Sequence, residues 1–207
     1  VLTGTSSPAV YYDTQALGTT GGSGTGAVTY STGASTACSV VGSTLTITAS
    51  TGTCTVTATK AGDATYNPAT SAPVSITVGP ATLTVTPDAK AVNYGDPVPA
   101  YTFSVTGFRN SETAGTAAGY TAPTCTSDYT PATPVADSPR TITCSGGSAD
   151  NYTFDTSATA QLTIGKVDQA PLVLTGIAML TLLTTASAQP PAVNLDGDRT
   201  LVARLGH

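Results

Sequence analysis

The sequence of 207 residues lacks tryptophan and contains only one methionine and three phenylalanines. Hydrophobic residues still make up 40% of the chain, so any core has to be built mainly from Val, Leu, Ile, Ala and Tyr. Charged residues make up only 9%, with 7 Lys and Arg against 12 Asp and Glu. Because so few cations cannot form a basic surface, we expect no nucleic acid partner.

Residues that usually carry acid–base chemistry are also scarce. His207, the last residue, is the only histidine, and Glu112 is the only glutamate. A hydrolase needs a base beside its nucleophile, and the sequence contains no GxSxG motif. The aspartates lie mostly in turn sequences such as YGDP and AGDA, where Asp bonds its own backbone. We therefore predict no catalytic residues and no enzyme activity.

Two short motifs resemble ligand-binding loops. Residues 21–26, GGSGTG, lack the Lys-Ser/Thr and the helix with which a glycine-rich loop binds phosphate. Residues 194–200, NLDGDRT, carry oxygen ligands at alternate positions, as part of a calcium loop does, but lack its distal glutamate. We interpret the first as a loop and the second as a turn, and we predict no cofactor and no metal site.

Neither of two candidate targeting segments predicts a leader or a membrane span. The N-terminal VLTGTSS has no basic residue and no apolar run, so we interpret the sequence as an internal or mature fragment. The stretch IAMLTLLTTASAQ, residues 177–189, resembles a leader's apolar region and cleavage site, but it lies inside the chain without a basic flank. Its threonines weaken a membrane span, so we predict no transmembrane segment.

A repeat with a period of 86 residues runs through the chain. Residues 55–79 align without a gap with residues 141–165, and the identical pairs include Thr55 and Thr141, Tyr66 and Tyr152, and Gly79 and Gly165. Both segments read as a strand, a Gly/Asp turn, a tyrosine and a last strand. We therefore predict two domains, which we call the first half (residues 1–79) and the second half (residues 80–166), followed by a tail (residues 167–207).

The boundary between the halves lies in VGPATL, residues 78–83. Gly79 and Pro80 end one strand just before Leu83 begins the next. A linker this short restricts the motion of one half relative to the other, so we expect a semi-rigid arrangement of the two halves.

Apolar and polar residues alternate with the strand period of two. The segment TLTITASTGTCTVTATK, residues 44–60, places threonines on one face and, on the other, Leu45, Ile47, Cys54, Val56 and Ala58. We predict that it forms a β-hairpin with one buried and one solvated face. Short strands bounded by Gly, Pro, Asn and Asp about every ten residues predict an all-β chain of β-sandwiches.

The four cysteines show no zinc-site spacing, and an even number in a weakly charged chain favours structural disulfides in an oxidising compartment. Cys38 and Cys54 are in phase with apolar neighbours, so both should point into a core. We predict the pairs Cys38–Cys54 and Cys125–Cys144, 16 and 19 positions apart, with one in each half. Loops of this length correspond to about 3 kcal/mol of stabilisation each.

The two halves resemble two families. YGDPVPAYTFSVTGF and SADNYTF, within residues 83–166, are similar to an MBG-type domain of large bacterial surface proteins. GGSGTGAVTYSTG and GTCTVTATKAGDATYNPATS, in the first half, are similar to a bacterial immunoglobulin-like repeat.

These resemblances imply two tandem immunoglobulin-like antiparallel β-sandwiches, and they supply no catalytic residues. Such modules occur in long secreted or cell-surface bacterial proteins, often adhesins, where they act as stalks. We therefore expect an extracellular or cell-surface location and a non-enzymatic structural role in a stalk, adhesin or fibre.

The tail resembles the start of a third repeat. Its residues 173–176, VLTG, repeat residues 1–4 at a distance of 172, twice the period, but residues 177–207 do not match the first half. One hypothesis is that the tail adds as a strand to a neighbouring copy and links monomers head to tail. The residues that would donate this strand are Leu172, Val173, Leu174, Leu180, Leu182 and Leu183. The alternative is that the tail packs on its own second half.

The alternative function is a binding module for a cell-surface glycan or protein. The candidate contact residues are aromatic and lie outside the clearest strands: Tyr11, Tyr12, Tyr120 and Tyr129. If they cluster on one exposed face, binding is favoured, and if they are buried or scattered, a spacer is favoured. For a spacer, the expected partners are neighbouring copies of the chain or adjoining repeats.

Overall fold

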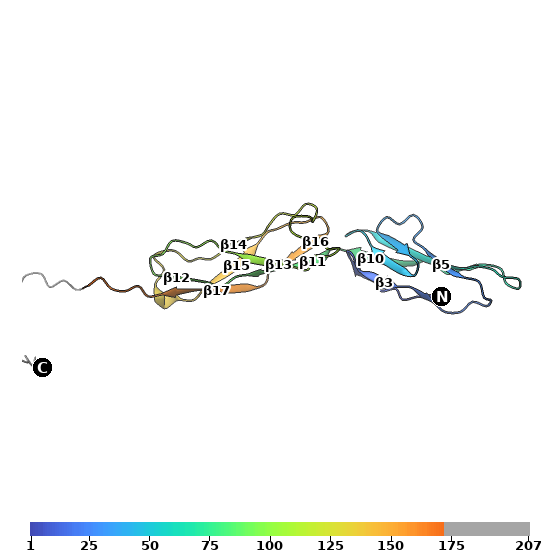
Figure 1. The fold of residues 1–207 in the computed structure, drawn as a ribbon, viewed down its shortest axis with the longest axis horizontal. Helices are drawn as coiled ribbons and strands as arrows, with labels where there is room; N and C mark the ends of the chain where they lie inside the picture. The colour runs from blue at the N-terminus through green and yellow to red at the C-terminus, as the bar shows by residue number, and fades with distance from the viewer. Residues whose placement is uncertain (172–207) are drawn as a thin grey trace, which may run out of the picture. The chain divides into compact units, whose positions relative to one another are not determined.

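The structure is a computed structural model, and it describes residues 1–171 (Figure 1). Over these residues the chain forms seventeen short strands and one 3-10 helix, η1 (Val135–Asp137), without an α-helix. The chain is therefore all-β in the described range, as the alternating sequence pattern predicts.

The first half contains three sheets. Its strands are β1 (Leu2–Thr3), β2 (Ala9–Val10), β3 (Thr14–Ala16), β4 (Gly18–Thr19), β5 (Val28–Ser31), β6 (Cys38–Val41), β7 (Thr44–Ile47), β8 (Thr53–Lys60), β9 (Ala69–Thr70) and β10 (Val74–Gly79). The sheet orders are β1-β4, β3-β7-β6, and β2-β10-β8-β5 with β9 also pairing β8. Pairing is antiparallel except between β2 and β10, which run parallel.

The second half contains two sheets. Its strands are β11 (Ala81–Pro87), β12 (Lys90–Asn93), β13 (Phe103–Thr106), β14 (Thr124–Thr126), β15 (Arg140–Ser145), β16 (Tyr152–Asp155) and β17 (Thr159–Gly165). The orders are β13-β11-β16 and β12-β17-β15-β14, with β11–β16 and β12–β17 parallel. Several sheets around buried apolar side chains are consistent with β-sandwiches.

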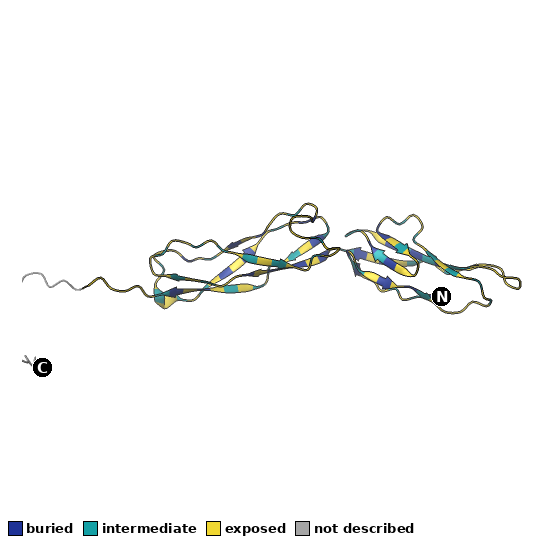
Figure 2. Ribbon diagram, viewed as in Figure 1, coloured by how far each residue is buried: buried dark blue, intermediate teal, exposed yellow. Residues whose placement is uncertain are grey.

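Burial alternates along the strands, as Figure 2 shows. In β11, every second residue is buried and the threonines between them are exposed. Ile47, Val56 and Ile76 are fully buried in the core of the first half, and Ile142 and Leu162 in that of the second half. Leu, Ile, Val and Cys therefore form the cores, while the threonines form their solvated side.

The hairpin predicted for residues 44–60 is wrong. Strand β7 pairs with β3 and β6, whereas β8 pairs with β5, β9 and β10, so the chain crosses from one sheet to another at residues 48–52. Both strands still turn their apolar residues into one core. Alternation shows which face of a strand is buried. The same alternation occurs in two strands paired as a hairpin and in two strands that face each other across a core, so it does not tell these arrangements apart.

The repeat is present in the strand pairing. On β8 and β10, Cys54 lies opposite Ile76, and on β15 and β17, 86 residues later, Arg140 lies opposite Leu162. The two strand pairs therefore have the same register. The two tyrosines at the repeated position differ in their structure and burial. Tyr66 lies in a loop and is 48% exposed, whereas Tyr152 lies on β16 and is 7% exposed.

Both predicted disulfides are present, and they connect different structures. Cys38 of β6 and Cys54 of β8 join two sheets of the first half. Cys125 of β14 and Cys144 of β15 lie directly opposite each other within one sheet of the second half. The first disulfide therefore crosses the core, and the second fixes an edge strand to its neighbour.

Residues Val1–Asp168 form one compact unit. One cluster of buried residues lies in the first half and a second in the second half, while a third combines Tyr11 with Ala81, Leu83 and Tyr152. The two halves thus share a packed contact within this unit. The domain boundaries at residues 79/80 and 166/167 remain predictions.

Candidate functional site

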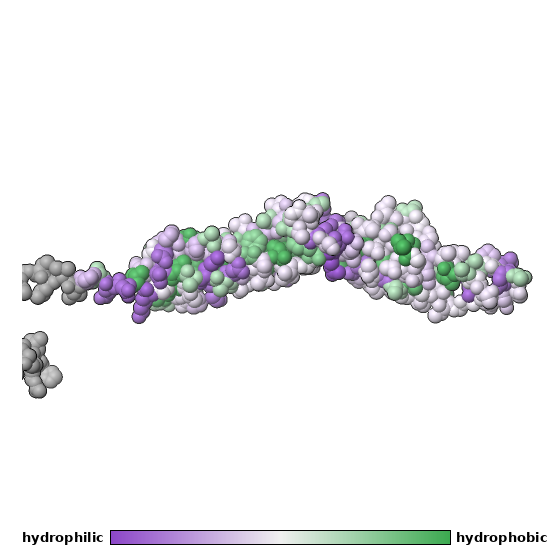
Figure 3. Space-filling view, in the orientation of Figure 1, coloured by the Kyte–Doolittle hydropathy of each residue, from purple (hydrophilic) through white to green (hydrophobic). Residues whose placement is uncertain are grey.

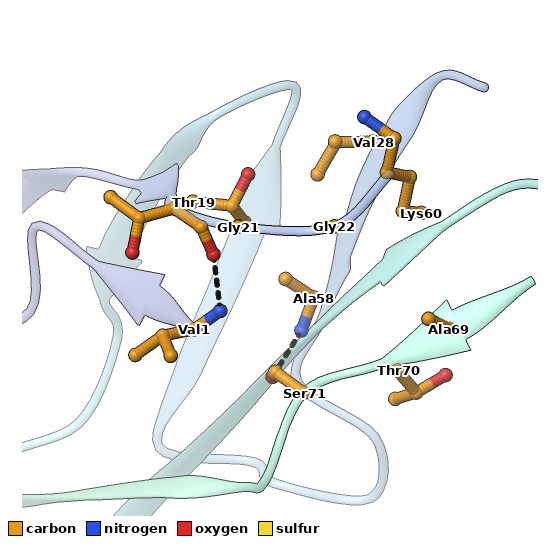
Figure 4. A pocket seen from close by; sticks show the side chains of 11 residues that line it. Val1, Thr19, Gly21, Gly22, Val28, Ala58, Lys60, Ala69, Thr70 and Ser71 are labelled. Carbon is orange, nitrogen blue, oxygen red and sulfur yellow. Dashed lines mark hydrogen bonds between the residues drawn. The ribbon is translucent and has the colours of Figure 1, made fainter. Parts of the chain in front are cut away.

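One cavity of about 130 Å³ lies beside the N-terminus, against β5, β8 and β9 (Figure 4). The Val1 ammonium group donates to the Thr20 carbonyl at 2.6 Å, and the Ala58 N–H donates to Ser71 Oγ at 3.0 Å. Pockets for small molecules usually measure about 300–1,000 Å³. This cavity is too small to be a good candidate site.

Two other hollows are larger, about 400 Å³ beside Asp128 and Arg140 and about 310 Å³ beside Ser31 and Thr55, but both are wide open to solvent and enclose no site. Within residues 1–171, no three His, Cys, Asp or Glu side chains come together in a group that could hold a metal ion. No helix in this range is long and apolar enough to cross a membrane. On the face in Figure 3, hydrophobic residues appear as small separate spots. The contacts between the two halves are therefore the best candidate functional site.

We call this site the joint, and we define it by Tyr11 and Asp13 of the first half and Arg109, Glu112 and Tyr152 of the second half. The N–H group of Tyr11 donates to the Gly79 carbonyl at 2.9 Å, which holds the tyrosine beside the end of β10. Its ring packs edge-on against Tyr152, with centroids 5.6 Å apart and an interplanar angle of 81°. This edge-to-face geometry is the one that aromatic quadrupoles favour.

Glu112 connects the two halves through its carboxylate. Tyr11 Oη donates to Glu112 Oε1 at 2.9 Å, and Tyr152 Oη donates to Glu112 Oε2 at 2.5 Å. Hydrogen bonds to an ionised carboxylate are shorter and stronger than those between neutral groups. The only glutamate of the chain therefore joins a tyrosine from each half.

Two further contacts surround this carboxylate. The N–H group of Arg109 donates to Tyr152 Oη at 2.9 Å, and the Arg109 guanidinium forms an ion pair with Asp13 at 3.4 Å. The side chains of this pair are 44% and 36% exposed, so the pair contributes at most about 1 kcal/mol. The buried tyrosines and Glu112 thus dominate the joint.

The loop after β13 presents Arg109 and Glu112 on the same side. Gly107 has φ +101°, and a Cβ there would lie 2.5 Å from the Thr82 carbonyl oxygen, so only glycine fits without a shift. Asn110 and Ser111 both adopt the left-handed region, and the Glu112 N–H donates to the Arg109 carbonyl at 2.9 Å. This tight turn places the side chains of Arg109 and Glu112 against Asp13 and Tyr11 of the first half.

Burial governs the protonation of the joint. It raises the pKa of Tyr152 to about 12, and the hydrogen bond to Glu112 acts in the same direction. Burial also raises the pKa of Tyr11, with the Glu112 hydrogen bond as the second cause. Both phenols therefore stay protonated at neutral pH and can donate to the carboxylate.

The four tyrosines of the binding alternative do not gather on one exposed face. Tyr11 is 7% exposed in the joint, and Tyr129 is 2% exposed, with its hydroxyl donating to the Asp96 carbonyl at 2.8 Å. Tyr120 is half-buried against Phe108, and only Tyr12 is exposed. A tyrosine can enter a core when its hydroxyl finds a partner, and residue type alone did not show this. These tyrosines therefore give no support to the glycan- or protein-binding alternative.

The strand-donor residues, Leu172, Val173, Leu174, Leu180, Leu182 and Leu183, lie outside the described residues. Their role stays a prediction. The same holds for the calcium-like sequence at residues 194–200, which we interpret as a turn.

Sequence reasoning missed the joint. Of its residues, only Tyr11 was singled out for contact, and it was expected on an exposed surface. Glu112 had a signal of its own, because it is the only glutamate of a chain poor in charge. A single charged group in such a chain is a candidate for a specific contact, but its partners lie 101 and 40 positions away.

Comparison with known families supports the interpretation of the second half. Residues 83–163 match the MBG domain (YGX type), which confirms the resemblance found in the sequence. The MBG domain is a structural repeat family, and it suggests a repeat module of surface proteins. No curated protein and no solved structure matches the chain significantly. The similarity of the first half to a bacterial immunoglobulin-like repeat remains a prediction.

Proposed function

We propose, from the MBG domain at residues 83–163, that the chain is a non-enzymatic structural segment of a bacterial surface protein. In this role its two halves are consecutive modules of a stalk. Their partners are adjoining repeats or neighbouring copies of the chain.

The joint is the observation that carries this proposal. A stalk keeps its distal end at a distance only if consecutive modules resist bending at each boundary. The boundary here has a linker of one residue, Pro80, between β10 and β11. It also has two tyrosines hydrogen-bonded to one carboxylate. A short linker and a packed contact both restrict the motion between modules.

The disulfides and the surface support an extracellular location. Disulfides persist in oxidising compartments, and each half contains one. The exposed positions of β11 are all threonine, and threonines also occupy the outward face of β8, which suits a solvated strand without adding charge. Labelling of the surface protein on intact cells with a membrane-impermeant reagent would test this location, and labelling only after lysis would contradict it.

The stalk role predicts that the two halves reorient together in solution. Residual dipolar couplings measured separately on the two halves should fit one alignment tensor. The double variant Tyr11→Ala with Glu112→Ala should require two tensors, whereas the control Tyr66→Ala, in an exposed loop, should still require one. Two independent tensors for the unaltered chain would contradict the proposal.

The finer hypothesis is head-to-tail assembly by strand addition from the tail. A chain ending at Asp168 should then lose any assembly that the full chain shows in light scattering. Equal particle sizes for the two chains would reject strand addition and leave the stalk role intact.

A further inference from the structure

The last strand of each half pairs in parallel with a strand near the start of the same half. In the first half β10 pairs with β2, and in the second half β17 pairs with β12. We call these two pairs the end-strand pairs. In a parallel pair the chain enters one strand at one end and leaves the other strand at the opposite end. Tension on the two ends of a half therefore slides the paired strands along each other and loads the hydrogen bonds between them together.

Both end-strand pairs close in the same way where the chain leaves the half. Gly79 and Gly165, the last residues of β10 and β17, are 86 positions apart and so occupy one position of the repeat. The Tyr11 N–H donates to the Gly79 carbonyl at 2.9 Å. The Tyr94 N–H donates to the Gly165 carbonyl, also at 2.9 Å. The two pairs can therefore be compared residue by residue from this end.

The two end-strand pairs differ in length. The pair β2–β10 joins two residues of each strand, whereas β12–β17 joins four. In the first half the ladder stops before Thr77, whose N–H donates instead to Ser7 Oγ at 3.0 Å. The equivalent residue of the second half, Thr163, lies opposite Ala91 within the ladder. The last strand of the first half is therefore held by the shorter ladder.

The strands through which the chain enters each half show the same contrast. The first half begins with β1, which pairs only with β4 and over two residues. The second half begins with β11, which pairs with β13 on one side and with β16 on the other, over four residues each. A force that pulls a strand out of a sheet has to break the ladders on all of its paired sides. The second half is therefore the more firmly held at both of its ends.

We propose that the two halves unfold under tension in a fixed order, the first half before the second. The short ladders of β1 and β2 separate at the lower force, and the second half stays folded until the longer ladders of β11 and β12 separate. The first half is by this means the part of the described chain that lengthens first under load. This inference rests on the proposed stalk role for its use, whereas the order itself depends only on the strand pairing.

The test is force spectroscopy on the full chain of 207 residues, pulled by a tag at each end. To identify the first half, Gly and Ser residues are inserted after Gly21, which is exposed and where an added Cβ would meet nothing within 4 Å. This position lies outside the segment that the Cys38–Cys54 disulfide closes, so the insertion extends with the rest of the first half. An insertion of about ten residues lengthens the unfolding event of that half by about 35 Å, because an extended residue spans about 3.5 Å.

The insertion after Gly21 should lengthen the event of lower force. The matched control is the same insertion after Gly146 of the second half, which is also exposed without a neighbour within 4 Å, and it should lengthen only the event of higher force. The opposite assignment, or a single event for both halves, would overturn the proposal. The stalk role fails separately: labelling of the surface protein only after lysis would contradict it without changing the order of unfolding.

A second measurement tests whether the end-strand pair of the second half carries the load. The Asp96 N–H donates to the Asn93 carbonyl at 3.0 Å, and Gly95 has φ 90°. In such a turn proline is favoured at the position of Tyr94, so Tyr94→Pro keeps the turn and removes only the N–H that closes the pair. It should speed the unfolding of the second half at a fixed force about fivefold, the effect of one hydrogen bond. Tyr94→Ala, which keeps this N–H, is the control, and equal rates in the two variants would overturn the role of the pair.

Discussion

At one position of the repeat the first half carries Tyr30 opposite Ala58, and the second half carries Cys125 opposite Cys144. Ala58 and Cys144 are 86 residues apart, so the second disulfide occupies a site that the first half fills with a tyrosine and an alanine. At another position, Cys54 of the first half corresponds to Arg140 of the second, which is paired with Asp128. The halves thus share a strand pairing but place their disulfides differently.

This difference shows that the shared strand pair does not dictate where a disulfide belongs. In the first half the disulfide joins two sheets across the core, where Cys54 is fully buried. In the second half it joins β14, a three-residue edge strand, to its neighbour. A short edge strand has few ladder bonds of its own, so a covalent link to the adjacent strand compensates for its length.

The largest expected effects test the shared strand pair. Ile76 and Leu162 occupy equivalent positions in the two halves, and both are completely buried. Ile76→Ala and Leu162→Ala should each lower the free energy of unfolding of their half by about 3 kcal/mol, because each leaves a cavity. Urea unfolding followed separately in each half measures this. Effects that differ by more than about 2 kcal/mol would contradict the equivalence of the two strand pairs.

Removal of the disulfide should destabilise the two halves to different extents. The double variants Cys38→Ala with Cys54→Ala and Cys125→Ala with Cys144→Ala each lose about 3 kcal/mol from loop entropy. The first should lose more, because its disulfide also holds two sheets together across a fully buried position. Urea midpoints of the two variants give the comparison. A larger loss in the second half would show that the edge strand matters more than the link between sheets.

The joint can be compared with a surface ion pair. Glu112→Gln replaces one acceptor of a tyrosine hydroxyl by an amide group, which should cost about 1–3 kcal/mol. Asp128→Asn, which removes the exposed partner of Arg140, should cost less than about 1 kcal/mol. Thermal unfolding of the two variants measures both. Similar shifts in the melting temperature would indicate that the carboxylate of Glu112 adds nothing beyond an ordinary surface charge.

Alkaline pH should weaken the joint. Tyr152 has a folded pKa of about 12 against an ordinary value of 10.0, because burial disfavours its charged form. The stabilisation is therefore complete below pH 10 and is lost as the pH rises toward 12. Unfolding measured between pH 9 and pH 12 should show this loss, and Tyr152→Phe should reduce the slope. An unchanged slope in that variant would assign the loss to another group.

Acid pH should affect the loops of the first half around Asp63. Asp63 accepts hydrogen bonds from the N–H groups of Thr25, Thr65 and Tyr66, which lowers its pKa to about 2. Its contribution is present above about pH 4 and is lost as the pH falls toward 2. The NMR shifts of these three amides should titrate together near pH 2. A midpoint near the ordinary value of 3.8 would show that the hydrogen bonds do not persist in solution.

Much of the fold could be predicted from local patterns. Alternation identified the buried faces of β7, β8, β10 and β17, because period two reports directly which side chains point inward. The repeat identified two equivalent pairs of segments, and the structure shows that the strands of each pair have the same register. The partner of β7 could not be predicted in this way, because the sheet in which a strand lies depends on residues far along the chain.

The candidate site was the least predictable part. Tyr66 and Tyr152 occupy the same position of the repeat, yet one is exposed and the other is buried in the joint. Their difference comes from their surroundings: Asp63 and Gly24 lie beside Tyr66, while Glu112 and Tyr11 cover Tyr152. A repeat shows which residues of the two halves are equivalent in sequence. The burial of each residue depends on the side chains that pack against it, and these can come from the other half.

By itself, the sequence determined the all-β class, the buried faces, the 86-residue repeat and the pairing of the cysteines. These features depend on the alternation of side chains and on spacings along one chain, which are local. Only the tertiary structure decided that residues 44–60 cross between sheets, and that Tyr11 and Tyr152 share the carboxylate of Glu112. Those contacts join residues 40–101 positions apart, and they form only when separate elements pack together.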